Sequence, residues 1–427
     1  MSDTMSDRNL VLVGGGHAML PSLARAEEWA RRGVAVTLID AHPWLYYSGM
    51  VPEYLGGIYR ENEVRIDLSR LCKRAGIDFH RGRATAIHPA DRTVRTDDGR
   101  EIDYDLLALN LGGSNPSPPG DVIATKPIYK IQDLARRVQQ TLSDPSVSLR
   151  LAIAGGGAAG VEVALNLTAR FISAGRARDL DLTLIEARPQ ILPAFPDGMR
   201  SEVRRRLRHR GVRVRTGTKV TRIEDGTVVT AGSAPPLPVD AVLWATGAVG
   251  PTLLQQSGLP TEERGFVRVS PTLRVSNHPR IFAAGDCAAV AGYEDLARVG
   301  VHAVKQGPVL RRNLDRSLRQ MRLEGKPAAA SDLTSFRPYP AAPLILSTGT
   351  PEGLWTTGSL WWSGTAALRL KHWIDRRWMR AYHPSWRNRP LRTYASAKAA
   401  ASSHLPASSA SPDRSPEATT PEPVGSR

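Results

Sequence analysis

The chain has 427 residues, with 57 Lys and Arg against 41 Asp and Glu, and a formal net charge of +16. Hydrophobic residues make up 41% of it, which excludes a wholly disordered chain, and a count of 2 cysteines excludes a disulfide-stapled secreted scaffold. No apolar run reaches the roughly 18 residues of a membrane span, and the first ten residues are polar and acidic. We therefore expect a cytoplasmic globular protein of two or three domains.

The same short pattern occurs twice along the chain. Residues 10–16 read LVLVGGG and 36–43 read VTLIDAHP, while 151–157 read LAIAGGG and 182–189 read LTLIEARP. Each copy gives a buried strand, a glycine turn, a helix, a second strand and a terminal acid in the same order. Glycines at such a turn allow a pyrophosphate to approach closely, and the N-terminus of the helix then faces it. The sequence therefore predicts two dinucleotide-binding βαβ units in an α/β fold.

The two copies differ at the third glycine of the pattern. The second copy has all three, Gly155, Gly157 and Gly160, whereas the first has Gly14 and Gly16 followed by Met19. Because the third glycine normally lets the helix pack close to the strand, we expect the first helix to lie farther out or to tilt. The terminal acids, Asp40 and Glu186, are each placed to accept a hydrogen bond from a ribose hydroxyl.

Two segments carry most of the positive charge. Residues 200–215 hold eight arginines against one glutamate, and residues 369–392 hold eight lysines or arginines against one aspartate. Nucleic-acid binders show such segments, but a solvated helix between two strands accounts better for the first of them. We therefore expect no nucleic-acid partner.

Further segments resemble those of a known protein family. Residues 241–247 (AVLWATG), 281–288 (IFAAGDCA) and 296–314 are similar in order and spacing to the later strands and helix of two-dinucleotide flavoproteins, the pyridine nucleotide-disulfide oxidoreductases in the broad sense. Within that family the chain most resembles type II NADH dehydrogenases and the flavoprotein module fused to selenophosphate synthetase. The latter has similar stretches to residues 47–52 and 370–382 here.

The resemblance implies both an architecture and an activity. Two Rossmann-like domains are expected: a discontinuous FAD-binding domain at 8–118 and 246–322, and an NAD(P)H-binding domain inserted at 119–245. The cofactors would be FAD and NAD(P)H. Reduced nicotinamide would pass a hydride to the flavin, which would then reduce an acceptor.

The resemblance also implies roles for individual residues. The residues implied to bind FAD are Gly14, Gly16, Asp40, Ala84, Gly285 and Asp286. Those implied to bind NAD(P)H are Gly155, Gly157, Gly160, Glu186 and Gly247. Glu186 favours NADH, because a 2′-phosphate would meet its carboxylate, although Arg188 would soften that preference. Glu162 is the candidate catalytic group beside the nicotinamide; alternatively it only stabilises the N-terminus of a helix.

The residues leave the electron acceptor open. Cys72 and Cys287 are expected to be packing residues, so we do not expect turnover through thiols. Type II NADH dehydrogenases carry two glutamines where quinone enters, and this chain has Val301 and Lys305 at those places, with Gln306 one step off the register. The acceptor is therefore expected to be a small molecule such as a quinone, or a soluble carrier protein. A nicotinamide- and FAD-binding regulatory protein with little turnover is the alternative.

The C-terminal region, residues 336–392, is rich in tryptophan and is expected to form a small separate element. Six of the nine tryptophans lie between residues 355 and 386; they are Trp355, Trp361, Trp362, Trp373, Trp378 and Trp386. Leu370, Ile374, Trp378 and Tyr382 recur at every fourth place and would form one apolar stripe on a helix. That stripe suits a lipid surface, which would place the protein peripherally on the inner face of the membrane. It suits equally well packing on the body or a homodimer interface.

The ends of this region are predicted from composition. Pro384 should end the helix, and residues 321–335 are similar to a loop. Residues 393–427 hold 8 Ser, 8 Ala and 5 Pro and are expected to be a disordered tail.

Overall fold

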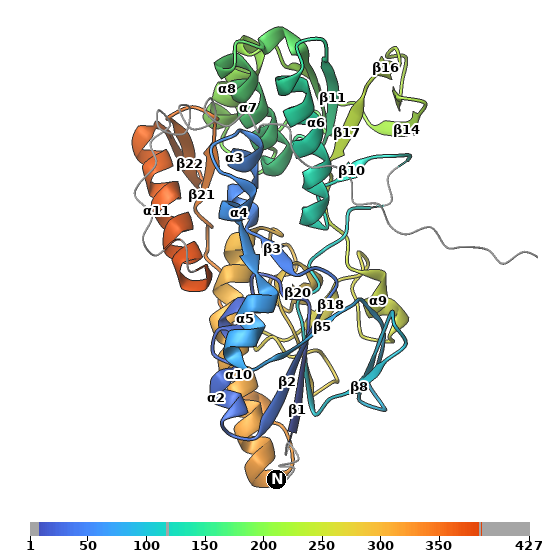
Figure 1. The fold of residues 1–427 in the computed structure, drawn as a ribbon, viewed down its shortest axis with the longest axis vertical. Coiled ribbons are helices and arrows are strands. Elements are labelled where there is room, and N and C mark those ends of the chain that lie inside the picture. Colours follow the sequence, from blue (N-terminus) through green and yellow to red (C-terminus); the bar gives the residue numbers. More distant parts are fainter. Residues whose placement is uncertain (1–7, 117–118, 384–385, 387–427) are drawn as a thin grey trace, which may run out of the picture.

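A first parallel sheet forms the core of one half of the molecule (Figure 1). The computed structural model describes residues 8–116, 119–383 and 386. This sheet has the strand order β19-β9-β1-β2-β5, and all neighbouring strands are parallel. Its strands are β1 (Arg8–Val13), β2 (Val34–Asp40), β5 (Asp78–Arg81), β9 (Leu106–Leu109) and β19 (Ile281–Ala283). The three central strands are mainly buried apolar residues, as is typical of a parallel sheet covered on both faces.

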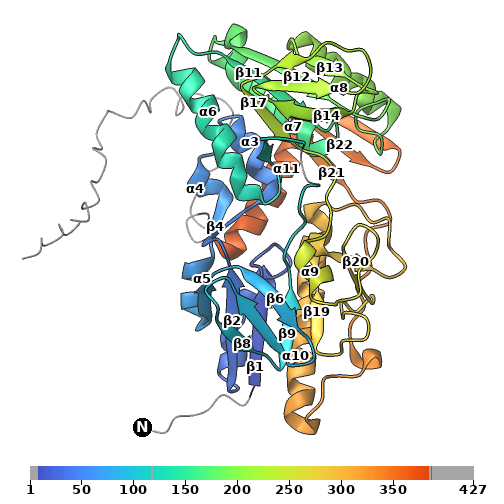
Figure 2. The same cartoon turned by 90° about the vertical axis from the view of Figure 1, so that its right-hand side faces the viewer.

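Helices and a small antiparallel sheet cover the first sheet (Figures 1 and 2). The helices are α1 (Leu20–Leu23), α2 (Glu27–Ala30), α5 (Leu68–Ala75) and α10 (Gly300–Glu324), and α10 packs on α1. The small sheet consists of β6 (Ala84–His88), β7 (Thr93–Thr96) and β8 (Glu101–Asp103). A loop was predicted for residues 321–335. Its first residues, up to Glu324, belong instead to α10, in which Met321 is buried. The helix ends only where Gly325, at a φ of +72°, caps it.

A second parallel sheet forms the other half, with the strand order β10-β17-β11-β12-β13. Its strands are β10 (Ile123–Ala124), β11 (Leu149–Ala154), β12 (Leu180–Ile185), β13 (Arg213–Arg215) and β17 (Ala241–Trp244). The helices beside it are α6 (Ile131–Ser143), α7 (Ala158–Ser173) and α8 (Asp197–His209). The antiparallel strands β14 (Val220–Glu224), β15 (Thr227–Thr230) and β16 (Leu237–Pro238) form a separate small sheet. A helix between two strands was predicted for the arginine-rich segment 200–215: α8 covers it to His209, and its last arginines lie on β13.

The carboxyl ends of the two sheets face the same interdomain space. β9 ends at Leu109 and β17 ends at Trp244. Five residues beyond each end, Ser114 and Val249 exchange backbone hydrogen bonds of 2.9 and 2.8 Å. Ligands of parallel α/β sheets bind outside the carboxyl ends of the strands. Sites on the two halves therefore open toward each other.

Shorter elements connect these layers. β3 (Trp44–Tyr46) pairs with β4 (Arg65–Asp67), and β18 (Val267–Val269) pairs with β20 (Ala288–Val290). The short helices are α3 (Val51–Leu55), α4 (Glu61–Val64) and α9 (Thr252–Gln256). α3 lies between strands β2 and β5 of the first sheet in the chain but packs on α7 of the second half, so it joins the two halves.

A C-terminal element lies alongside both halves. Its antiparallel strands are β21 (Leu344–Ser347), β22 (Gly353–Thr357) and β23 (Leu360–Gly364), and they are followed by α11 (Thr365–Tyr382). β21 contacts α7, β23 contacts α8, and both views place α11 beside the gap between the two halves (Figures 1 and 2). α11 ends at Tyr382, whereas Pro384 and the predicted tail at 393–427 lie outside the described residues. In the described ranges, no helix has an apolar stretch long enough to cross a membrane.

The amphipathic pattern of α11 is inverted. Its buried face is charged and carries Lys371, His372, Asp375 and Arg376, whereas Leu370 and Ile374 of the predicted stripe are 39% and 43% exposed. Trp378 and Tyr382 of the same stripe are only partly buried, against the body of the protein. The single stripe expected from the spacing was therefore wrong: its first half faces solvent and its second half packs. Trp386, for which lipid contact and packing on the body were both open, is buried.

Candidate functional site

A cavity of about 360 Å³ lies at the carboxyl edge of the first sheet. It is lined by the glycine turn after β1, the end of β2 and the turn after β19. All six residues predicted to bind FAD line this cavity, namely Gly14, Gly16, Asp40, Ala84, Gly285 and Asp286. The fold thus brings together residues from both ends of the predicted discontinuous domain.

The first glycine turn has no room for side chains. Gly14 has a φ of +88°, and a Cβ there would lie 2.4 Å from the carbonyl oxygen of Asn110. A Cβ on Gly16 would lie 1.9 Å from Oδ1 of Asn110. The turn must therefore be built from glycine, which leaves bare backbone along the cavity wall. This fits a pyrophosphate, which needs close approach of the backbone.

The carboxylate of Asp40 fixes this turn. Its Oδ2 accepts a hydrogen bond of 2.6 Å from the N–H of Gly15, and its Oδ1 accepts one of 2.8 Å from the N–H of His42. Burial raises the pKa of Asp40, while these two N–H groups act to lower it. Each carboxylate oxygen can accept a further hydrogen bond, so the predicted contact with a ribose hydroxyl is compatible with this geometry.

Gln306 and Asn110, of which the sequence did not single out Asn110, hold the turn after β19. Gln306 accepts a hydrogen bond of 2.6 Å from the N–H of Gly285, and Asn110 donates one of 2.6 Å to the carbonyl oxygen of Ala284. Asp286, next in the chain, forms an ion pair of 2.5 Å with Lys126. Gln306, considered only as a displaced quinone residue, thus supports the wall of the predicted flavin cavity.

Aromatic rings connect α11 to the wall of the cavity. The Trp378 ring stacks on Tyr47 at 4.2 Å and on His17 at 5.3 Å between ring centroids. His17 lines the cavity, and burial lowers its pKa to about 4, so the imidazole is neutral at pH 7. The C-terminal element therefore shapes the candidate flavin site.

The second unit repeats the glycine geometry. Gly155 has a φ of +122°, and a Cβ there would lie 2.4 Å from the carbonyl oxygen of Ala245. A Cβ on Gly160 would lie 2.0 Å from the carbonyl oxygen of Gly155. Gly157 is the N-cap of α7, and a Cβ there would meet no atom within 4 Å. The N-terminus of α7 therefore opens onto free space beside the turn, as phosphate binding requires.

Glu186 occupies the same place in this unit as Asp40 does in the first. Its Oε2 accepts a hydrogen bond of 2.7 Å from the N–H of Gly156, and its Oε1 accepts one of 2.8 Å from the N–H of Arg188. Gly247, beyond the end of β17, is exposed. The predicted NAD(P)H-binding residues therefore lie around one strand edge.

Glu162 is buried, at the fifth position of α7. Its Oε1 accepts hydrogen bonds from the backbone N–H of Ser347 at 2.7 Å and from the Ser347 hydroxyl at 2.8 Å. Burial raises the pKa of Glu162 to about 7, although Lys371 and the Ser347 bonds act to lower it. This carboxyl therefore changes protonation near neutral pH. A group with that property can hold or release a proton during turnover.

A buried charged cluster next to Glu162 joins α3 to α11. Glu53 accepts hydrogen bonds of 2.7 Å from Lys371 and 2.6 Å from His372, and Lys371 also bonds Asp375 at 2.8 Å. Burial by itself would raise the pKa of Glu53, but Lys371 and His372 lower it to about 2. Removing one partner of such a cluster leaves an uncompensated buried charge. The charged face of α11 is therefore part of the core.

The two thiols are enclosed, as predicted for packing residues. Cys72 on α5 and Cys287 after β19 are both free and fully buried. Burial raises the pKa of Cys72 to about 12 and that of Cys287 to about 11. Neither side chain is a thiolate at neutral pH, so neither is prepared to act as the nucleophile of thiol-based turnover.

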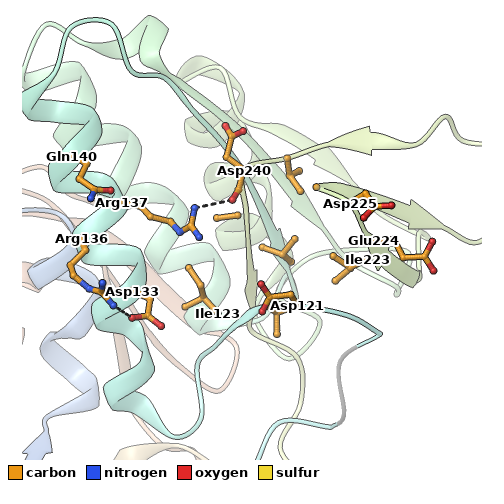
Figure 3. Close-up of a pocket in the computed structure, with 15 residues that line it drawn as sticks. Asp121, Ile123, Asp133, Arg136, Arg137, Gln140, Ile223, Glu224, Asp225 and Asp240 are labelled. Carbon is orange, nitrogen blue, oxygen red and sulfur yellow. Dashed lines mark hydrogen bonds and ion pairs between the residues drawn. The ribbon is translucent and has the colours of Figure 1, made fainter. Parts of the chain in front are cut away.

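A larger cavity, of about 670 Å³, lies at the opposite edge of the second sheet (Figure 3). It is lined by the beginnings of β10 and β17, and its charged groups partly neutralise one another. Arg136 pairs with Asp133, and Arg137 donates to the carbonyl oxygen of Asp240. Because nucleotides bind at the carboxyl ends of parallel strands, this cavity is not the nicotinamide site.

Two facing dinucleotide units, each with a glycine turn and a terminal acid, define a two-dinucleotide oxidoreductase. A family model described as pyridine nucleotide-disulphide oxidoreductase matches residues 8–307. The chain belongs to this family. It is an FAD-dependent NAD(P)H oxidoreductase, and the predicted class and α/β fold are confirmed.

Relatives of this chain support the same class. It is 26% identical over 367 residues to the NADH dehydrogenase-like protein YutJ of Bacillus subtilis, covering 83% of this chain and 98% of that protein. It is 25% identical over 395 residues to the type II NADH:quinone oxidoreductase of Staphylococcus saprophyticus, covering 87% and 95%. The fold is similar to that of NDH2 from Plasmodium falciparum in complex with NADH, with a TM-score of 0.72, 14% identity, and coverage of 90% and 99%.

Proposed function

We propose that this oxidoreductase passes electrons from NADH through FAD to a membrane quinone. The observation that carries the proposal is the meeting of the two sheets at their carboxyl edges through Ser114 and Val249. A dinucleotide on each glycine turn would extend into the space between them. When bound, FAD accepts a hydride from the nicotinamide and delivers electrons to the acceptor. The protein aligns the two rings and handles the proton.

NADH rather than NADPH is proposed as the donor. Both oxygens of Glu186 already accept backbone hydrogen bonds, which fixes the carboxylate at the end of β12. A 2′-phosphate at that place would bring a second negative charge against it. The exposed side chain of Arg188 lies two residues away and would only partly offset this repulsion.

Glu162 is proposed as the group that handles the proton. Its pKa of about 7 lets the carboxyl gain or lose a proton near neutral pH. Ser347 and Lys371 give it polar neighbours that reach toward the buried cluster of α11. A carboxyl that merely stabilised a helix N-terminus would be ionised, because ionisation is what the helix dipole favours.

Quinone is favoured over a soluble carrier by the surface of the C-terminal element. Leu360 and Trp362 on β23 are exposed, and so are Leu370, Trp373 and Ile374 on α11. Exposed Arg369, Arg377 and Arg380 lie on the same helix. Apolar side chains with tryptophan and arginine are typical of a surface that lies in a lipid headgroup layer. We propose peripheral binding there, on the inner face of the membrane.

The membrane contact is best tested by point substitutions. Truncation of α11 would remove Lys371 and His372, the hydrogen-bond partners of buried Glu53, and is expected to unfold the core. We expect Trp373→Ser together with Ile374→Ser to weaken binding to anionic vesicles about tenfold, since two exposed apolar side chains that would enter the lipid are lost, with FAD content unchanged. Exposed Leu323 on α10, changed to Ser, is the matched control. Equal vesicle binding by the wild type, the double variant and the Leu323→Ser control would show that this surface does not contact the membrane.

The electron acceptor is tested by screening the reduced enzyme. Purified protein, reduced with NADH under anaerobic conditions, would be mixed with a water-soluble quinone, ferricyanide or a ferredoxin-like protein. The proposal predicts fast reoxidation by the quinone. Val301 and Lys305 stand where the family's quinone glutamines would be, and the Lys305 ammonium lies 3.7 Å from the centre of the Tyr339 ring. Reoxidation by the carrier protein alone, with strong inhibition by salt, would assign a soluble acceptor instead.

A further inference from the structure

An ion pair spans the two halves of the molecule inside the flavin cavity. Lys126 lies just after β10 in the second half, and Asp286 lies on the turn after β19 in the first half. Lys126 Nζ and Asp286 Oδ2 are 2.5 Å apart, although the residues are 160 positions apart in the chain. Both residues line the cavity that holds the glycine turn. The pair is therefore part of the cleft itself.

The pair is partly shielded from water. The side chains of Lys126 and Asp286 are only 27% and 23% exposed. Arg298 also lines this cavity, but it donates to the carbonyl oxygen of Ala288 at 2.5 Å and lies 4.2 Å from the centre of the Phe266 ring. His17 is neutral, as shown above. Arg298 therefore acts on Asp286 only from a longer distance, whereas Lys126 forms the direct ion pair with its carboxylate.

The ion pair reduces an electrostatic repulsion that bound FAD would otherwise meet in the cleft. FAD brings a pyrophosphate with two negative charges into a cavity that already contains Asp40 and Asp286. Asp40 is held by two backbone N–H groups, which partly satisfy its charge. Asp286 without a cation would repel the pyrophosphate strongly, because charges interact over longer distances where water is excluded. A fixed ammonium beside it removes that repulsion.

We propose that Lys126 is a positioning residue of the flavin site, which neutralises Asp286 and holds its carboxylate so that the cleft accepts anionic FAD. The inference deepens the function proposed above and rests on the flavin cavity assigned there. Lys126 would affect FAD binding only through Asp286. This role differs from a direct contact between Lys126 and FAD, and from an ion pair that merely holds the two halves together, which we call a latch.

A double-mutant cycle separates these roles. FAD would be removed from the full-length chain and its affinity for each variant measured by quenching of flavin fluorescence. We expect Lys126→Met to weaken FAD binding about tenfold, because it leaves a shielded carboxylate unpaired, and Asp286→Asn alone to weaken it about threefold. Adding Asp286→Asn to Lys126→Met should restore the affinity to that of Asp286→Asn. Lys130→Met, four residues on and exposed, removes the same charge and should change binding less than twofold.

The FAD affinities of these variants support or overturn the positioning role of Lys126. A double variant that binds FAD as weakly as Lys126→Met would overturn it, and so would three variants with equal losses, which a latch predicts. Lys126→Arg keeps the charge and should bind within threefold of the wild type; if Lys126→Met does not fold by circular dichroism, Lys126→Gln takes its place in the cycle. Failure of the wild-type chain to bind FAD would defeat the proposed function. Normal binding by Lys126→Met would defeat only this inference.

Discussion

The two dinucleotide units are alike where they would touch a ligand and differ where they touch the protein. Both pair their first and second strands over six parallel positions. In both, the terminal acid accepts the N–H of the middle glycine and the N–H two residues after itself. The glycine turn and the terminal acid thus form the same hydrogen-bonded arrangement in both units. The sequence pattern describes this part of each unit, which faces the expected ligand.

The helices that follow the two turns are very different. α7 runs unbroken from Ala158 to Ser173, whereas the first unit has only the separate turns α1 and α2. Gly160 lies against the carbonyl oxygen of Gly155 with no room for a Cβ, and the first unit has the fully buried Met19 at that place. Its helix therefore starts later, at Leu20. The predicted shift of the first helix is in fact a break, and α10 packs there, with Gly307 against Ala18.

The largest effect is expected from Gly157→Val in the second unit. A Cβ at Gly157 would meet no protein atom within 4 Å, so the variant should fold and keep FAD. The side chain would occupy the place of the pyrophosphate, and reduction by NADH should fall by about 100-fold or more. Stopped-flow spectroscopy of the flavin absorbance measures this rate. An unchanged rate would show that the nicotinamide nucleotide binds elsewhere.

Met19→Gly would restore the missing glycine to the first unit. If Met19 were only a tolerated departure from the pattern, glycine at this position should not lower the free energy of unfolding. Because the side chain is fully buried, we expect instead a loss of about 3–5 kcal/mol in the free energy of unfolding, from the cavity left and the added backbone freedom. Urea unfolding followed by circular dichroism checks this. A stability equal to the wild type would mean that the first helix can re-form against the turn.

Glu162→Gln should change how stability depends on pH. The native pKa of about 7 lies above the ordinary value of 4.5, so the folded protein holds a proton that the unfolded chain releases. That contribution is complete below pH 4.5 and is lost as the pH rises through 7. The stability of the wild type relative to Glu162→Gln should therefore fall by about 3 kcal/mol between these values. A difference that does not vary with pH would show an ordinary pKa for Glu162.

Glu186→Ala has the smallest expected effect of the four. Removing the carboxylate takes away its repulsion of a 2′-phosphate, so the ratio of kcat/KM for NADH to that for NADPH should narrow about tenfold. Part of the loss with NADH will come from the unsupported N–H groups of Gly156 and Arg188. An unchanged ratio of the two kcat/KM values would show that Glu186 does not contact the ribose. Asp40→Ala is the counterpart in the first unit and should weaken FAD binding without altering this ratio.

The sequence predicted the parts of this protein that repeat or follow a strong period. The strands, the glycine turns and the arginine-rich helix α8 were found from apolar runs and glycine spacing, and all six residues expected around FAD line one cavity. The numbered domain boundaries and the individual roles of the site residues remain predictions. These features are local in the chain, which is why one sequence suffices to find them.

What the sequence missed depends on contacts between distant segments. Lys126 and Asp286 are 160 positions apart, and Glu162 and Ser347 are 185 apart, so no spacing rule connects them. The face of α11 was misjudged because its charged residues pair with Glu53 of α3, and such a buried cluster has the same local pattern as a solvated surface. Tertiary partners decide which face of a helix is buried.

If the two facing units carry electrons from a bound nicotinamide nucleotide to FAD, an anaerobic titration of purified wild-type protein with NADH will show it in the flavin absorbance. We expect a yellow protein that is bleached by one equivalent of NADH, while Gly157→Val stays yellow. A protein that remains colourless after incubation with FAD, or a Gly157→Val variant that is bleached as fast as the wild type, would contradict it.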